Sequence, residues 1–274
     1  AEIGTAFKAP SFSELFLNFE GATYRVIGAN SIEFYLDDLE INGQLQDRYF
    51  SDHKEIRAEQ SFSHLYNLSL QINDKTRFTA AYTANHIANY IELVPVALNN
   101  KSYRIYSYRN ISGLRSRTAT LSLSWNPIPS MHLNGAYIYT RAEDESVLEA
   151  IQKRSILNNI GKPVQAADYG GLFDRSIHQF KLTARFQSDF GFSSMLNLHY
   201  RGPFGTIEND ADGNGILNLK SEYEDAFVTI DLNLRQALNS HLSTQLRIAN
   251  LGDFRSTSQK LYGRKIQFGI NYTY

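Results

Sequence analysis

The sequence predicts an all-β protein, an antiparallel transmembrane β-barrel. Three observations predict it: strands with alternating polarity, an aromatic-rich composition, and connections that are short and long in turn. The last strand shows the alternation most clearly. In residues 264–274, isoleucine, phenylalanine and tyrosine alternate with glutamine, glycine, asparagine and threonine. Because successive strand side chains point to opposite faces, one face of this segment is apolar and the other polar. A barrel strand between lipid and a wet lumen has this pattern.

The same alternation recurs along the chain. It is found in segments 67–72, 118–125, 178–187, 196–201, 228–235 and 242–248. Helical spacing fits none of them as well. A soluble, half-buried antiparallel sheet also alternates, so a soluble β-sheet binding module is an alternative.

Composition agrees with a barrel and excludes other classes. Aromatic residues make up 13% of the chain, which suits aromatic girdles at the two bilayer interfaces. Mean hydropathy is −0.36, and no apolar run approaches the roughly 20 residues of a membrane helix. The chain has no cysteine, which excludes a disulfide framework and thiol chemistry. A net charge of −1 gives no sign of nucleic-acid binding.

Short and long connections alternate strictly. Turn-forming residues mark short connections at 73–75, 126–131, 189–191 and 239–241, and long polar stretches cover 10–57, 92–103, 142–176, 202–222 and 251–263. Tight periplasmic turns and long extracellular loops have this asymmetry. We expect about ten strands: one ending near Phe7, then 59–72, 77–91, 104–125, 132–141, 178–188, 192–201, 223–235, 242–250 and 264–274. Several exceed the ~10 residues that cross a bilayer, so we expect them to project beyond it. Residues 143–153 suit a short amphipathic helix.

Two short sequence boxes resemble a known family. The run G-T-A-F-K-A-P-S-F-S-E-L-F at 4–16 is similar to an F-R-A-P box of TonB-dependent outer-membrane receptors, with Lys8 where arginine is usual. The run R-A-E-Q-S-F-S at 57–63 resembles the start of that family's following strand, with Ala58 in place of proline. Segments 85–91, 108–111, 250–253 and 263–274 continue the resemblance in order, so it covers essentially the whole chain.

The resemblance implies a barrel of about 22 strands with a plugged lumen. Residues 1–274 would form one unit, the last ten or so strands of that barrel domain, without the plug and the segment that contacts TonB. Ten strands do not close a barrel of that size, and an open edge is costly in hydrocarbon, so we expect the sequence to be part of a longer protein. The implied location is the outer membrane of a Gram-negative bacterium, as a multi-pass β-barrel.

The implied function is active, TonB-energised uptake of a scarce nutrient. The expected ligand is an iron–siderophore, then haem, cobalamin or a glycan; the expected partners are outer-membrane lipid and, through the missing N-terminal region, TonB. No nucleic acid is expected. Another interpretation is a complete barrel of ten to twelve strands acting as an adhesin or passive channel. We expect no enzyme, because serine and histidine residues are scattered rather than grouped with an orienting partner.

Basic and histidine residues are the candidates for ligand binding. Lys181, Arg185, Arg201, Arg235 and Arg247 fall on the predicted lumen face, where they would attract anionic ligands such as ferric siderophores or pair with a polar plug. His53, in the longest outer loop, and His86, at the outer end of a strand, are candidate haem ligands; solvated polar positions are the alternative. The segments expected to capture cargo are 37–54, 143–174 and 208–222.

One loop carries a partial calcium-binding sequence. D-A-D-G-N-G at 210–215 resembles the first half of an EF-hand loop, with Asp210, Asp212 and Asn214 at positions one, three and five. Position twelve is Ser221, and Glu222 comes one residue later. The sequence predicts a Ca²⁺ site in an outer loop, with an acidic, glycine-rich hairpin as the alternative; no other cofactor is required.

Overall fold

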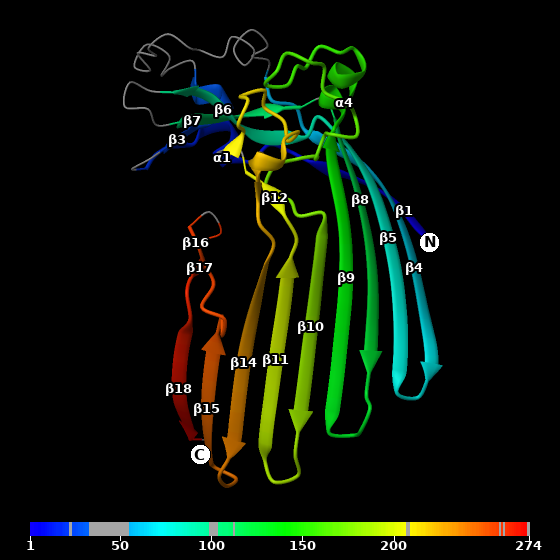
Figure 1. Ribbon diagram of the computed structural model, residues 1–274, viewed down its shortest axis with the longest axis vertical. Helices are drawn as coiled ribbons and strands as arrows, with labels where there is room; N and C mark the ends of the chain where they lie inside the picture. The colour runs from blue at the N-terminus through cyan, green and yellow to red at the C-terminus, as the bar shows by residue number, and fades with distance from the viewer. Residues whose placement is uncertain are drawn as a thin grey trace.

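The computed structural model describes residues 1–21, 24–32, 55–98, 104–111, 113–206, 209–257, 259 and 261–272. Its main element is a ten-stranded sheet in which every strand pairs antiparallel with its neighbours (Figure 1). In spatial order the strands are β1 (Glu2–Lys8), β4 (Glu59–Asn73), β5 (Thr76–Ala88), β8 (Gly113–Trp125), β9 (Met131–Asp144), β10 (His178–Gln187), β11 (Phe192–Arg201), β14 (Phe227–Ala237), β15 (Leu242–Ala249) and β18 (Lys265–Tyr272). The predicted all-β class and the predicted meander of ten strands are confirmed.

Tight turns lie at one end of this sheet and long connections at the other (Figure 1). Asparagine side chains hold two of the turns. Asn73 Oδ1 accepts a hydrogen bond of 2.9 Å from Lys75 N, and Asn239 Oδ1 accepts one of 2.8 Å from Leu242 N. Asparagine favours turns because its side chain bonds the backbone two or three residues on. The predicted alternation of short and long connections is therefore confirmed.

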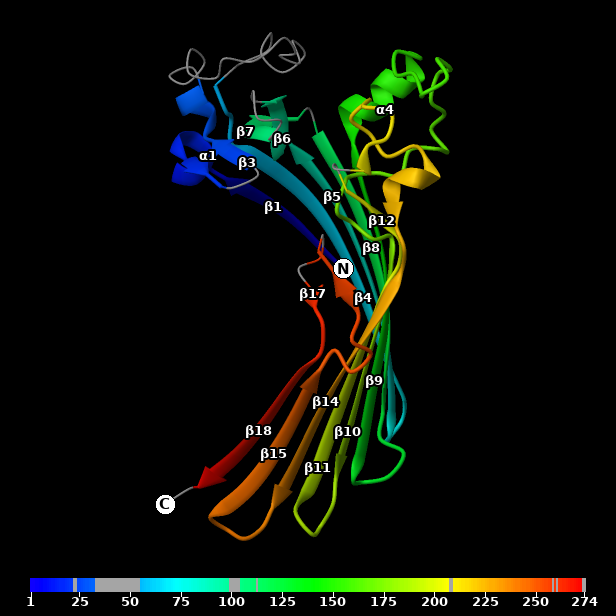
Figure 2. The same cartoon turned by 60° about the vertical axis from the view of Figure 1, so that its left-hand side comes forward.

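The sheet is strongly curved (Figure 2). Its strand register gives it two chemically different faces. On one face Phe78, Leu123 and Gly135 are lateral neighbours across three strands. One residue along, the neighbours Thr79 and Ser122 occupy the other face. Antiparallel partners share a face, so the alternation in the sequence becomes an apolar surface and a polar surface.

A smaller four-stranded sheet lies beyond the end with the long connections. Its order is β2 (Asn18–Glu20), β3 (Tyr24–Ile27), β7 (Arg104–Asn110) and β6 (Ile91–Leu98), with β3 and β7 parallel. Three expectations need correction here. The strand expected over 104–125 is two strands, β7 and β8, and the strand expected over 77–91 ends at Ala88, with Ile91 opening β6. The long connections expected over 10–57 and 92–103 contain β2, β3 and most of β6. The strand expected over 104–125 is interrupted at Asn110, because the Asn110 side chain bonds the backbone of Arg57. Its Oδ1 accepts a hydrogen bond of 2.6 Å from Arg57 N, and its Nδ2 donates one of 2.9 Å to Arg57 O.

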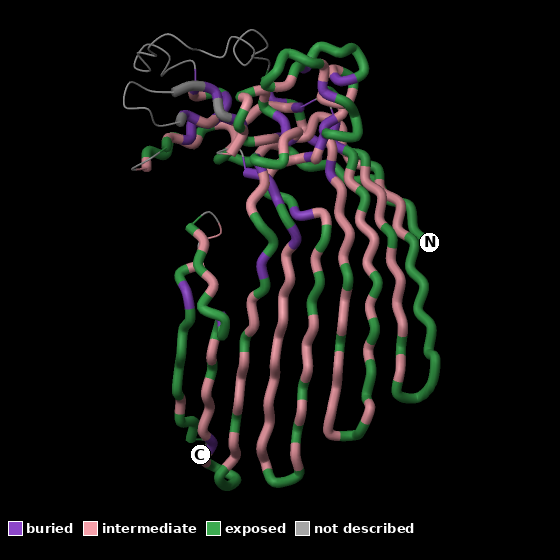
Figure 3. Tube along the Cα trace, viewed as in Figure 1, coloured by how far each residue is buried: buried purple, intermediate pink, exposed green. Residues whose placement is uncertain are grey.

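Most buried residues lie in this outer layer rather than in the ten-stranded sheet (Figure 3). The side chains of the ten-stranded sheet are buried only where another layer covers one of its faces. The long connections, by contrast, pack their apolar side chains against one another. One cluster contains Tyr169 and the residues Ile151, Ile156, Val164 and Ile216. A second cluster contains Ala29, Ile56 and Ile91. The outer loops are thus packed structures with cores of their own.

Two helices have clear start signals. In α1 (Phe12–Phe16), Ser11 and Glu14 form a reciprocal capping box. In α4 (Glu145–Gln152), Asp144 caps the first turn by accepting from Ser146 N at 2.7 Å. The helix expected at 143–153 is confirmed. Within the described ranges, no helix combines the length and the apolar character needed to cross a membrane.

Shorter elements complete the outer ends. They are the 3-10 helices η1 (Ala29–Ser31) and η3 (Lys220–Glu222), the pair β12 (Phe204–Gly205) and β13 (Tyr223–Glu224), and the pair β16 (Arg255–Ser256) and β17 (Leu261–Tyr262).

Candidate functional site

The polar face of the ten-stranded sheet carries the basic residues predicted to bind ligand. Arg185 lies opposite Met195, Met195 lies opposite Asn233, and Asn233 lies opposite Arg247. Arg185 and Arg247 therefore stand in one lateral row across four strands. By the same register, the face is shared by all five candidates, Lys181, Arg185, Arg201, Arg235 and Arg247.

Part of this face lines an open hollow of about 620 Å³ near the tight-turn end. Arg185 and Arg235 both line it, together with Asn233 and Gln245. Arg235 Nε donates to Ser243 Oγ at 3.3 Å. Lys181 and Arg185 donate no side-chain hydrogen bond to any other residue in the described part of the chain. The hollow therefore presents positive charge, and the guanidinium of Arg185 has N–H groups free to donate to a ligand.

Arg201 differs from the other four. Its guanidinium lies 4.0 Å from the centre of the Phe204 ring and donates to Asp174 O at 2.8 Å and to Gln259 Oε1. These contacts tie the outer end of β11 to two loops. Arg201 is thus engaged structurally, whereas Arg185 and Arg235 face the hollow.

The two histidine candidates do not come together here. His53 and the predicted capture segment 37–54 lie outside the described residues. His86 belongs to the apolar face, because it follows Tyr82 and Ala84 at alternate positions of β5. Its Nε2 lies 3.1 Å from Glu145 Oε2 at the start of α4. His86 is therefore directed away from the polar face.

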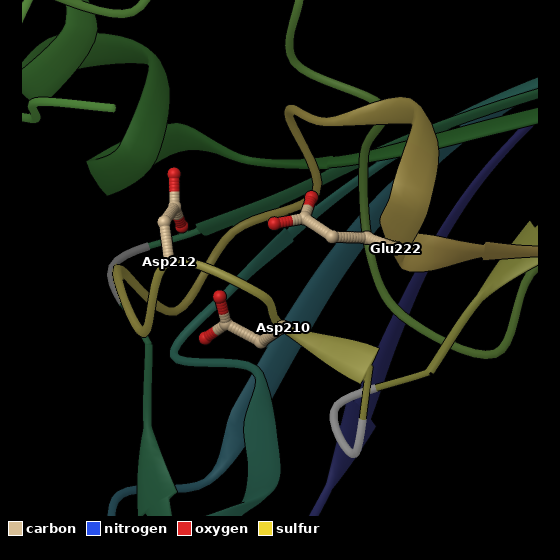
Figure 4. Close-up of side chains that lie close together, drawn as sticks. All are labelled: Asp210, Asp212 and Glu222. Carbon is tan, nitrogen blue, oxygen red and sulfur yellow. The ribbon is translucent and has the colours of Figure 1, made fainter. Parts of the chain in front are cut away.

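Three carboxylates converge in the loop between β12 and β13. Figure 4 shows Asp210, Asp212 and Glu222 with their side chains close together, and one oxygen of each lies within 4.8 Å of the others. Glu222 is fully buried and accepts from the backbone N–H groups of Asn218 at 2.7 Å and Leu219 at 2.8 Å. In the sequence Glu222 comes one residue late for an EF-hand; the 3-10 turn η3 brings it into the group.

Asn214 lies beside this group but is used differently. Its Oδ1 accepts from Ile216 N at 3.0 Å, and its Nδ2 donates to Asn218 Oδ1 at 3.0 Å. Burial and the charges of Glu222 and Asp212 raise the pKa of Asp210, against the backbone bond from Gly215 N. A bound cation would stabilise the ionised form of Asp210, because it would offset the mutual repulsion of the three carboxylates.

A further pocket, of about 310 Å³, lies between the four-stranded sheet and the 145–175 connection, which we call the α4 loop. Glu92 lines it, and desolvation by burial raises the pKa of this carboxyl, against the attraction of Arg175. Tyr169 closes one side, and its hydroxyl oxygen accepts a hydrogen bond of 3.1 Å from Asp144 N. Glu92 was not among the predicted site residues. The residues next to it in the sequence do not indicate that a loop distant in the sequence covers its side chain.

Comparison with known proteins identifies the fold. The family model described as TonB-dependent receptor-like, β-barrel matches residues 1–251. No curated protein is similar enough in sequence to count as a match. Several solved structures share the architecture.

The copper transporter OprC matches with a TM-score of 0.60 and 12% identity, over 99% of this chain and 36% of that one. The siderophore receptor PirA of Pseudomonas aeruginosa matches with a TM-score of 0.57 and 12% identity, over 98% and 38%. The ferric-catecholate import receptor Fiu of E. coli matches with a TM-score of 0.52 and 17% identity, over 79% and 28%. The chain spans about a third of the length of these proteins.

These findings fit the geometry. An apolar outer face, a polar inner face and outward loops are the parts of a barrel that crosses the outer membrane, and the family consists of receptors and transporters rather than enzymes. The chain belongs to the TonB-dependent receptor β-barrel family and forms part of an outer-membrane β-barrel.

Proposed function

We propose that this chain forms part of the wall of a receptor that takes up an iron–siderophore complex, energised by TonB through a region outside the chain. The observation that carries the proposal is the hollow on the polar face, where Arg185 and Arg235 present positive charge. Ferric complexes of catecholate siderophores are anions, and a basic wall raises the local concentration of an anion. PirA and Fiu, which share the fold, are described as siderophore and ferric-catecholate receptors.

Haem is the weaker candidate. A haem pocket needs an axial ligand directed at the iron, and histidine is the common choice. His86 lies on the apolar face with Glu145 as its partner. The charge of the polar face supports the anionic siderophore instead.

Neutralising the hollow should weaken binding of an anionic ferric complex. In the full-length receptor, we expect Arg185→Gln with Arg235→Gln to lower affinity for a ferric tris-catecholate about thirtyfold, because each of the two lost charge–charge contacts contributes roughly 1 kcal/mol near a surface. Affinity for an uncharged ferric tris-hydroxamate should not change. Isothermal titration measures both, and Lys75→Gln, at an exposed position of the tight turn between β4 and β5, is the matched control. Equal loss for both complexes would contradict the proposed role of charge.

We also propose that Asp210, Asp212 and Glu222 hold a Ca²⁺ ion that ties the β12–β13 loop together. The sequence D-x-D-x-N-G and the convergence of the three carboxylates support this. Calcium takes oxygen ligands, and the sequence places Asn214 close enough to contribute through its carbonyl or a water.

Calcium affinity should fall as the solution is made more acidic. The pKa of Asp210 is raised, so this carboxyl takes up its proton at a higher pH than an ordinary aspartate, and only the ionised form binds the metal. Titration of the full-length receptor with CaCl₂ should therefore show weaker binding as pH falls through that raised pKa. Asp212→Asn should abolish binding, whereas Asp225→Asn, at an exposed position between β13 and β14, should leave it intact. Binding that is independent of pH, or that survives Asp212→Asn, would rule out this site.

A further inference from the structure

Two arginines face each other on the apolar side of the barrel. Arg117 of β8 and Arg141 of β9 are direct cross-strand partners. Arg117 shares its face with Leu121, Leu123 and Trp125 at alternate positions of β8. Like charges directly opposite each other in a sheet are destabilising unless something compensates them.

Their depth relative to the membrane follows from the strand register. The neighbouring lateral row contains Tyr66, Tyr82, Ala119, Tyr139 and His178. The rings of Tyr66 and Tyr82 lie 6.4 Å apart, and those of Tyr139 and His178 lie 5.7 Å apart. A row of this kind marks the boundary between hydrocarbon and headgroups.

The arginine pair stands one row further toward the loops, which is two residues or about 7 Å along a strand. This is the level of lipid headgroups, not of the acyl chains. Arg115 stands one row beyond, on the same face.

The neighbouring charges compensate two of the three arginines. Arg141 Nε donates to Glu143 Oε1 at 2.7 Å, and Arg115 Nε donates to Glu145 Oε1 at 2.5 Å. Arg117 is exposed and makes no ion pair or side-chain hydrogen bond with another residue in the ranges that the structure describes. Arg117 is therefore an uncompensated guanidinium between Arg115 and Arg141, which still have N–H groups to donate because each guanidinium carries five.

We propose that Arg117, supported by Arg115 and Arg141, binds a phosphate group of an anionic lipid in the membrane around the barrel. A phosphate between the facing guanidiniums relieves their repulsion and accepts paired, charge-assisted hydrogen bonds. Its acyl chains would then lie along the apolar strip of Leu121, Leu123 and Trp125. The site is on the outside of the barrel, so it is separate from the path of the cargo.

Lipid binding to the purified full-length receptor tests this. The probes are diphosphoryl lipid A and phosphatidylcholine, added in neutral detergent and counted by native mass spectrometry. We expect wild type to prefer lipid A and Arg117→Gln to lower that affinity about tenfold, the effect of losing one charged hydrogen bond. Arg77→Gln is the matched control, because Arg77 is on β5 but belongs to the polar face.

Melting temperatures measured with and without lipid A distinguish a loss of lipid binding from a folding defect. Without lipid A, Arg117→Gln should melt at the same temperature as wild type or higher, because a like-charge pair is removed. With lipid A, wild type should gain stability and Arg117→Gln should gain much less. The proposal is overturned if Arg117→Gln binds lipid A as tightly as Arg77→Gln, or if wild type does not distinguish lipid A from phosphatidylcholine.

Discussion

Replacing Gly171 by alanine is expected to detach the α4 loop from the end of β9. Gly171 has a φ of +92°, and a Cβ atom built there would lie 2.4 Å from the backbone oxygen of Ala142. That oxygen also accepts a hydrogen bond from Leu172 N at 2.9 Å, so it cannot move aside freely. The left-handed backbone and the overlap together cost roughly 2–5 kcal/mol. Hydrogen exchange of the purified receptor should show loss of protection in the α4 loop.

Gly161 is the matched control for this experiment. It lies in the same loop with a φ of +72°, but a Cβ atom built there meets nothing within 4 Å. Gly161→Ala should therefore cost only the backbone preference, about 1–2 kcal/mol. If both variants lose protection equally, close contact with Ala142 is not what holds the loop. A selective loss in Gly171→Ala would show that this contact does.

The strands were predictable from the sequence because their information is local. In β11, predicted and observed bounds agree, since Leu196 to Arg201 alternate and a tight turn at 189–191 comes just before the strand. Each such strand pairs with its neighbour in the chain, so the order of the sheet follows from the order of the sequence. Face assignment follows as well, which is why alternation alone assigns the five basic residues to one face.

The outer sheet was not predictable in the same way. Its strand β7 pairs in parallel with β3, which lies far away in the sequence, and local alternation carries no sign of that pairing. The break between β7 and β8 depends on Asn110, whose side chain bonds Arg57. The local sequence around a polar residue such as Asn110 does not indicate which distant residue its side chain bonds.

The candidate sites likewise combine features that the local sequence predicts with features that depend on contacts between distant residues. Asp210 and Asp212 were found from their spacing, but the burial of Glu222 depends on the turn of η3 and on backbone donors supplied by Asn218 and Leu219. The prediction for His86 rested on its position near the outer end of a strand. Its face is fixed by register, which places it beside Arg115 rather than in the lumen.

Glu59→Ala should loosen the junction between both sheets. Glu59 Oε1 accepts from Ile91 N at 3.0 Å and from Lys8 Nζ at 3.3 Å, and the Glu59 residue is only 8% exposed. Removing the carboxylate leaves the buried N–H of Ile91 without its acceptor, which costs about 1–3 kcal/mol. We expect a lower melting temperature and faster hydrogen exchange at the start of β6.

The same contacts give a physical reason for the two sequence boxes that resemble the receptor family. Lys8 Nζ also lies 2.8 Å from Glu14 Oε1, so one ammonium joins β1, α1 and β4. Lys8→Arg should preserve this junction, because a guanidinium can reach both carboxylates with separate N–H groups. Glu59→Gln should recover much of the stability lost in Glu59→Ala, because its amide oxygen still accepts from Ile91 N. If the glutamine variant is as unstable as the alanine variant, the charge pair with Lys8 is the essential contact and the bond to Ile91 is secondary.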